Sequence, residues 1–384
     1  MQSHHSQSAW SEAGTTIMVC VLLFLSFCFC WLYWFQADVL AVAQHVLSGG
    51  VTTYNPLVGA IIITIALQVL QLLVQTICRL RRRTHALTYL PSMLALAVVS
   101  DINANIDRHF SWGAWPWVVP IVLLAWGGVV WLARQVMPFG NGKEPTGLFS
   151  QRVWINTLIM VTMMLGVALV GNTNAVFHYQ AHAEYALSHG DTDEALRTGD
   201  RSLETNADLT MLRVYALSKE GQLAERLFRY PLAGTSADML PLSDSHARLM
   251  LLSPDSLWRH LGAKPSAAVT TARYFQVLQR DSLATPAVAD YVLCGRLIDR
   301  DIDGFARLLP QYYAVNDSLP RHYREALTLY THLRAHPVVV YQNAVADEDW
   351  ADLQKLERTY TNPRQRRAKM AERYGGSYWY YYYL

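Results

Sequence analysis

Four long uncharged segments constrain the fold of this chain more strongly than any other feature. They cover residues 15–35, 56–78, 115–133 and 153–170, and none of them contains Asp, Glu, Lys or Arg. A helix rises about 1.5 Å per residue, so roughly 20 residues cross the roughly 30 Å hydrocarbon core of a bilayer. Tryptophans stand near the ends of these segments, as expected for rings at the headgroup level. The sequence therefore predicts at least four transmembrane helices.

A fifth apolar segment, residues 84–100, decides the predicted topology. It contains Pro91 and would reach only about 25 Å as a straight helix, so it can either span the membrane or lie re-entrant. If it spans, most basic residues near the helix ends gather on one side, and Arg108 stands alone on the other. Because basic loops stay in the cytoplasm, we expect five spans, a cytoplasmic amino terminus and a non-cytoplasmic chain after residue 170. The gathered residues are Arg79, Arg81, Arg82, Arg83, Arg134, Lys143 and Arg152.

The apolar segments carry no ionisable Asp, Glu, Lys or Arg at membrane depth, which argues against a transporter or pump. Gln68, Gln71 and Gln75 share one face of the second helix, and we expect them to form hydrogen bonds between helices. The first residues lack a basic region, so a cleaved signal peptide is not predicted. The predicted regions are a cytoplasmic segment 1–14, a transmembrane helical bundle 15–174, a soluble helical domain 175–374 and an aromatic tail 375–384.

Oxygen-bearing side chains alternate with apolar ones after the third predicted helix. Asp101 and Asp107 begin and end this pattern, which superficially resembles a calcium loop. An EF-hand needs Gly at its sixth place and Glu at its twelfth, where this stretch has Ile106 and Trp112. The EF-hand is therefore excluded. A looser oxygen-rich cation site and a turn capped by short polar side chains both stay open.

Basic and imidazole groups supply the other candidate site residues. Arg108 and His109 form the only basic pair in a predicted non-cytoplasmic loop, where they could grip an anionic lipid-linked substrate, contact headgroups or lie in a solvated turn. His178, His182 and His189 share one face of the first soluble helix. HYQAH lacks the glutamate of HExxH, and the third histidine lies about two turns away, so we expect a polar helix face and no metal site.

The polar half of the chain predicts an all-α fold of antiparallel helix pairs. EYALSHGDTDEALRTGDRSLETNADL places Gly190 at a turn and Ala195 and Leu196 on the following helix. VYALSKEGQLAERLFRYPL follows, with Gly221 at the corresponding turn. These stretches resemble tetratricopeptide repeats, although the spacing of 31 residues between the two glycines is shorter than the usual 34 or so, and Gly199 replaces an aromatic residue. The resemblance implies a tetratricopeptide-like α-solenoid that binds partners.

A second resemblance concerns the end of the chain. LPRHYREALTLYTHL and the aromatic ending resemble uncharacterised polytopic membrane proteins of Bacteroidota that carry helical-repeat tails. That resemblance implies a bacterial inner membrane protein and no particular activity.

The chain ends in a basic segment followed by an aromatic tail. RQRRAKMAER, residues 364–373, predicts a basic helix that is either solvated or drawn to anionic headgroups. Gly375 and Gly376 then allow the backbone to turn. We expect the tail to reach back to the membrane interface, where aromatic rings are favoured. Its residues are Tyr378, Trp379, Tyr380, Tyr381, Tyr382 and Tyr383.

The sequence favours binding over catalysis. It contains no GxSxG, Walker, Rossmann or kinase motif, and it predicts no catalytic residue and no cofactor. A net charge of +2 argues against a nucleic-acid partner. We expect a membrane-anchored scaffold of the bacterial cell envelope, whose periplasmic helical domain binds protein or peptide partners while the bundle contacts the lipid bilayer. A membrane enzyme of envelope glycan or lipid assembly and a lipid-binding module stay open as alternatives.

Overall fold

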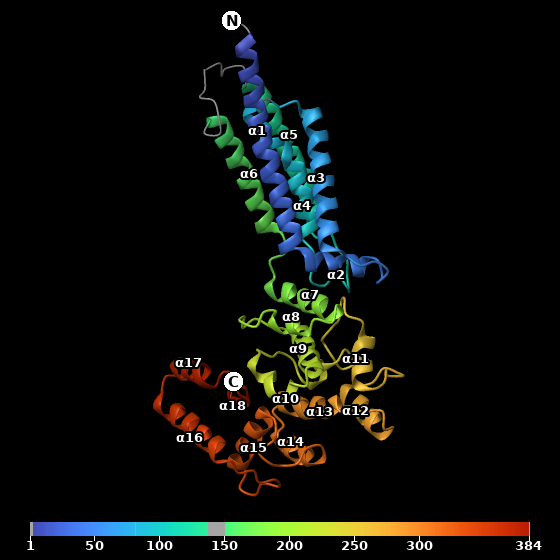
Figure 1. Ribbon diagram of the computed structural model, residues 1–384, viewed down its shortest axis with the longest axis vertical. Coiled ribbons are helices and arrows are strands. Elements are labelled where there is room, and N and C mark those ends of the chain that lie inside the picture. Colours follow the sequence, from blue (N-terminus) through green and yellow to red (C-terminus); the bar gives the residue numbers. More distant parts are fainter. Residues whose placement is uncertain (1–2, 81, 137–149, 384) are drawn as a thin grey trace. The chain divides into compact units, whose positions relative to one another are not determined.

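The computed structural model describes residues 3–80, 82–136 and 150–383, and all secondary structure in these ranges is helical (Figure 1). The chain divides into two compact units, a bundle unit of residues 1–174 and a C-terminal unit of residues 175–384. Each unit is built around its own cluster of buried apolar side chains. The two units are therefore considered one at a time.

The bundle unit contains, within its described residues, four helices that are long and apolar enough to cross a membrane, which indicates a membrane protein. Its fifth apolar segment is divided into a 3₁₀ helix and an α-helix, with Pro91 in the first turn of the latter. A short helix also follows the first span, where none was predicted. The elements are α1 (Ser3–Cys30), a π-helical turn (Trp31–Phe35), α2 (Ala37–Leu47), α3 (Pro56–Cys78), a 3₁₀ helix (Arg82–Tyr89), α4 (Leu90–Ser100), α5 (Trp115–Val136) and α6 (Gln151–Val170).

Hydrogen bonds define one end of the bundle. The indole Nε1 of Trp31, after α1, donates to the hydroxyl of Ser100 at the end of α4 over 2.8 Å. The next residue, Asp101, accepts from the indole of Trp115 at the start of α5, also over 2.8 Å. The ends of α1 and α4 therefore meet the beginning of α5.

A second set of hydrogen bonds defines the other end. Arg134, near the end of α5, donates through Nε to the carbonyl of Cys78 at the end of α3 over 3.0 Å. Asn156, in the first turns of α6, accepts from the backbone N–H of Ala86 over 2.7 Å. Segment 84–100 thus runs the length of the bundle, packed against α3 and α6. Its direction is the one that a fifth span requires.

The glutamines of α3 form the hydrogen bonds between elements that the sequence predicts. Gln71 is buried, and its amide donates to the hydroxyl of Thr88 over 2.9 Å. Gln68 donates to Gln71 over 2.8 Å, and Gln71 also reaches Gln75 over 3.3 Å. The ladder therefore satisfies polar groups inside an apolar bundle and ties α3 to the 3₁₀ helix, which confirms this prediction.

The C-terminal unit is a succession of short helices. Most of them lie where helix signals occur in the sequence, but α11 and α18 were not predicted. The elements are α7 (Ala175–Ser188), α8 (Thr192–Arg197), α9 (Ala207–Lys219), α10 (Leu223–Arg226), a 3₁₀ helix (Leu227–Arg229), a second 3₁₀ helix, η5 (Ser236–Met239), α11 (Pro254–Leu261), α12 (Thr271–Arg280), α13 (Ala287–Ile298), α14 (Ile302–Leu308), a third 3₁₀ helix, η6 (Leu309–Gln311), α15 (Arg321–Leu333), α16 (Ala344–Thr359), α17 (Pro363–Tyr374) and α18 (Tyr378–Tyr383).

Helix α8 is shorter than the predicted helix 191–205 because the chain turns at Gly199. This glycine has a φ of +62°, and a Cβ there would lie 2.8 Å from the ring of Tyr179. The turn exposes the carbonyl of Gly199 to the fully buried guanidinium of Arg213, which donates to it over 3.1 Å. Arg213 also donates to the carbonyl of Pro231 over 3.2 Å and lies over the ring of Tyr230. Early termination of α8 therefore gives a buried cation its partners.

A buried carboxylate ties α7 to the long irregular segment before α11. Glu184 is fully buried, and its Oε2 accepts from the backbone N–H groups of Met250, Leu251 and Leu252 over 2.9, 2.6 and 3.0 Å. Its Oε1 accepts from Gln180 over 3.3 Å. One side chain thus satisfies three consecutive buried donors, which no helix or strand supplies with partners.

Replacing Glu184 by alanine should destabilise the C-terminal unit by about 3 kcal/mol or more, because three backbone donors lose their acceptor inside the protein. The measurement is chemical unfolding of the full chain in detergent, followed by circular dichroism. Glu194→Ala is the matched control, since the half-exposed Glu194 pairs only with His182 and should contribute less than about 1 kcal/mol. Equal destabilisation by the two substitutions would contradict the assigned role of Glu184.

Candidate functional site

The loop residues singled out in the sequence do not converge on a site. Asp101 is engaged by the indole of Trp115, and Asp107, Arg108 and His109 are all exposed. The backbone N–H groups of Arg108 and His109 donate to the carbonyl of Asn105, as in a turn. Among the described residues, no group of three or more His, Cys, Asp or Glu side chains could hold a metal ion.

The two histidines of α7 also remain apart from any larger cluster. His182 Nε2 lies 3.2 Å from the carboxylate of Glu194 in α8, and His178 contacts the ring of Phe177. His189 instead contacts Tyr185, at the end of α7. These contacts belong to the packing of α7 and α8.

The aromatic tail lies in a different place from the predicted one. It forms helix α18 within the C-terminal unit, where Tyr378 and Trp379 are 0% and 3% exposed. The ring of Tyr378 packs against Phe228, and Trp379 packs against Trp350 and Tyr374. Side chains buried in this way are not available to a membrane interface. The prediction of an interfacial tail is therefore wrong for Tyr378 and Trp379, because the unit supplies an aromatic core for them to enter.

A buried carboxylate in α15 holds the tail in that core. Glu325 accepts from the backbone N–H of Tyr378 over 2.7 Å, and its own carbonyl accepts from the indole of Trp379 over 2.6 Å. Its carboxylate also accepts from Arg321 over 2.7 Å and from His322 Nδ1 over 2.9 Å. The tail is therefore anchored by hydrogen bonds as well as by ring packing.

The contacts of His322 define its tautomer. The backbone N–H of Phe228 lies 3.4 Å from Nε2, so Nε2 accepts, and Nδ1 carries the proton that faces Glu325. Burial alone would raise the pKa of Glu325. The hydrogen bond and charge of His322, the charge of Arg321 and the N–H of Tyr378 outweigh burial and lower this pKa below its usual range. Glu325 is thus held ionised as the acceptor that the tail requires.

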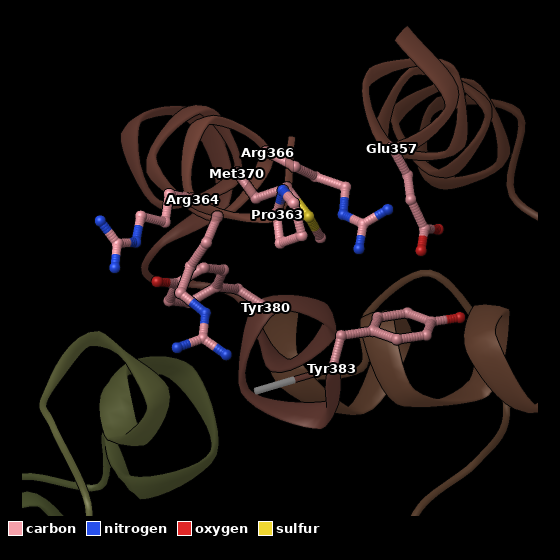
Figure 2. Close-up of a pocket in the computed structure, with 8 residues that line it drawn as sticks. Glu357, Pro363, Arg364, Arg366, Met370, Tyr380 and Tyr383 are labelled. Atoms are coloured by element: carbon pink, nitrogen blue, oxygen red, sulfur yellow. The ribbon is translucent and has the colours of Figure 1, made fainter. Parts of the chain in front are cut away.

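Helices α17 and α18 enclose a basic pocket of about 300 Å³. Figure 2 shows Arg364, Arg366 and Met370 of α17 on one side and Tyr380 and Tyr383 of α18 on the other. The remaining lining residues are Glu357, Pro363 and Arg367.

The arginines of the pocket differ from the other basic residues of α17. Lys369 pairs with Glu372, and Arg373 pairs with Asp352, each over 2.7 Å. The guanidinium groups of Arg364, Arg366 and Arg367 have no hydrogen-bonded or ion-paired partner in the described part of the chain. The basic helix therefore presents its unpaired charge to the pocket.

A second, larger concavity of about 400 Å³ lies between η5, α12, α13 and η6, and we call it the amide groove. Its floor contains buried side chains of Met239, Phe275 and Tyr291, and the hydroxyl of Tyr291 has no partner in the described residues. Three glutamines stand on its exposed rim: Gln276, Gln279 and Gln311.

The charged residues of the amide groove are largely neutralised. Arg296 pairs with Asp301 over 3.0 Å, and Asp299 accepts from the backbone N–H of Ser236 over 2.9 Å. Gly295 allows α13 to approach η5, since a Cβ there would lie 3.2 Å from the Cβ of Ser236. The groove thus offers amides and apolar surface, whereas the pocket of α17 offers charge.

Reasoning from the sequence missed both concavities. The amide groove joins residues from 236 to 312, and no local pattern connects them. For the basic pocket a signal existed, because the basic segment and the aromatic tail are neighbours in the chain. Only the packing of α18 reveals that they face each other across a cavity.

The comparisons with known proteins assign no activity. Residues 271–384 match the model of DUF6057, a family of unknown function. This range contains Glu325 and the whole basic pocket, but only part of the amide groove. No curated protein and no solved structure matches the chain.

Acidification should release the tail. A carboxyl whose folded pKa is lowered contributes stability above its unfolded pKa, and that stability is lost as pH falls through the folded pKa. Hydrogen exchange of residues 377–383, corrected for intrinsic rates, should therefore accelerate as pH falls below about 4.5, the ordinary value for a glutamate.

In Glu325→Gln the same amides should exchange rapidly even at neutral pH, because an amide presents a donor either to Nδ1–H of His322 or to the N–H of Tyr378. Glu372→Gln, which removes an exposed carboxylate on α17, is the control and should behave like the unsubstituted chain. An unaltered acid transition in Glu325→Gln would refute the role of this carboxylate.

Proposed function

We propose that this protein is a membrane-anchored scaffold of the bacterial cell envelope, whose C-terminal unit binds a peptide segment of a partner protein. The observation that carries this proposal is the amide groove, with its buried aromatic floor and its glutamine rim. An anchor of apolar helices would hold such a unit at the membrane.

The chemistry of the groove suits a peptide. A glutamine amide carries both donors and an acceptor, so it can pair with the N–H and C=O groups of an extended backbone. Phe275 and Met239 provide an apolar floor for one side chain of that peptide, and the unpartnered hydroxyl of Tyr291 offers a further polar contact. The groove volume of about 400 Å³ accommodates a large side chain.

The helix packing is compatible with a tetratricopeptide-like solenoid. Helix α7 packs against α8 and α9, and α14 packs against both α13 and α15. Gly190 and Gly221 both have positive φ values, of +82° and +65°, at the predicted turns between helices. Helical repeats of this kind display concave surfaces that bind peptides, in agreement with a groove on α12 and α13.

A bulky substitution in the groove tests the proposed binding. Full-length protein in nanodiscs should select peptides with a recurrent apolar residue from a random peptide library, and Ala272→Trp should weaken their binding about tenfold or more by filling the groove. Ala351→Trp, at an exposed alanine of α16 outside the groove, is the control and should bind normally. Peptides that bind Ala272→Trp as tightly as the unsubstituted chain would contradict this site.

The proposed topology has five spans, with the amino terminus in the cytoplasm and the C-terminal unit in the periplasm. Single cysteines at the exposed positions Ser111 and Ala368 should react with a membrane-impermeant maleimide once the outer membrane is permeable. A cysteine at the exposed Gln151, at the start of α6, should react only after the inner membrane is opened. The unsubstituted chain measures the background from native cysteines. Labelling of Gln151→Cys together with Ser111→Cys would exclude five spans.

A further inference from the structure

We propose that the basic pocket between α17 and α18 binds a phosphate monoester, either as a soluble metabolite or as the headgroup of a lipid. The site is separate from the amide groove and goes beyond the scaffold function. Figure 2 shows the arrangement on which the inference rests, with the arginines of α17 and the tyrosines of α18 around one cavity.

Unpaired positive charge determines the sign of the ligand. Arg364, Arg366 and Arg367 line the pocket without protein partners among the described residues, whereas Glu357 is the one carboxylate among the lining residues. Like charges repel one another, so three guanidinium groups around one cavity favour an anion that neutralises them. Arginines gathered without carboxylate partners are typical of anion sites.

The number of donors favours phosphate over carboxylate. A guanidinium presents a planar fork of N–H donors, and three of them exceed what the two oxygens of one carboxylate can accept. A phosphate monoester offers three terminal oxygens and carries nearly two negative charges at neutral pH. Its organic part would lie against Pro363 and Met370 on the apolar wall.

Side chains, rather than the start of α17, must hold the anion. Pro363 has no N–H, and the side chain of Asn362 already accepts from the backbone N–H groups of Arg364 and Gln365 over 2.9 and 3.4 Å. The helix dipole adds favourable potential without offering those donors.

The tyrosines of α18 complete the wall opposite the arginines. Tyr383 stacks on Trp350, and burial followed by the charge of Glu357 raises the pKa of its phenol, which stays protonated and able to donate. Tyr380 lies one turn earlier on the same helix. Both tyrosines are positioned because Glu325 anchors the start of α18.

The test is isothermal titration calorimetry of the full chain in non-ionic detergent, with glycerol 3-phosphate as the soluble probe and dihexanoyl phosphatidic acid as the lipid probe. The triple substitution Arg364→Gln, Arg366→Gln and Arg367→Gln should weaken binding of both probes by about tenfold or more, since it removes charge-assisted hydrogen bonds. Each single substitution should weaken binding by about threefold, and added salt should weaken binding to the unsubstituted chain.

Two matched variants separate a pocket from diffuse charge. Lys369→Gln removes the same charge from α17 outside the pocket and should leave affinity unchanged. Glu357→Gln should tighten binding by about threefold, because it removes the negative charge that faces the arginines. Circular dichroism melting verifies that each variant is folded, and the single substitutions at the exposed Arg364 and Arg367 keep the test decisive if the triple variant fails to fold.

The two probes distinguish the source of the phosphate. Equal affinity for both supports a soluble ester, and binding of the phosphatidic acid about tenfold tighter supports a lipid headgroup, provided that the arginine substitutions weaken both. Absence of saturable binding, equal binding to the triple variant or an equal loss in Lys369→Gln would overturn the proposal. None of these results bears on the amide groove, whose peptide binding is measured separately.

Discussion

Every buried polar group of the backbone needs a partner, and this requirement organises both units of the protein. In the bundle unit, apolar segments satisfy it by forming helices, because lipid offers no hydrogen bonds. The few polar side chains inside the bundle pair with each other or with the backbone, as Gln71 does with Thr88. In the C-terminal unit, buried carboxylates do the same for irregular segments. Glu184 accepts from three consecutive N–H groups, and Glu325 accepts from the start of the tail.

The anchoring of α18 links the interior of the C-terminal unit to its surface. One short helix places Tyr378 and Trp379 in the core, while Tyr380 and Tyr383 line the basic pocket. Aromatic residues at the end of a chain would otherwise expose a large apolar surface. Here each ring either packs against the core or bounds a cavity. The carboxylate of Glu325 therefore positions one wall of the pocket without lining it.

Helix periodicity and end signals in the sequence predicted most of the helices, because those signals are local. The turns at Gly190 and Gly221 lie where the sequence expects them, and α17 begins just after its predicted cap, Asn362. Helix α8 ended early because Gly199 meets the ring of Tyr179, a contact with another helix. The tail was predicted at the membrane for a similar reason, since its aromatic composition suits either an interface or a core. Neither candidate cavity could be predicted, because each joins residues from several helices.

The sequence by itself determined the separation of apolar and polar halves, the all-helical fold and the helices that are able to span a membrane, since these follow from local composition and periodicity. Tertiary structure decided where the aromatic tail lies and which charges stay unpaired. Lys369 and Arg373 find carboxylates, and Arg364, Arg366 and Arg367 face a cavity, although all five belong to one helix. Whether a charge is paired depends on what neighbouring elements bring to it, and only the packing of α16, α17 and α18 provides that.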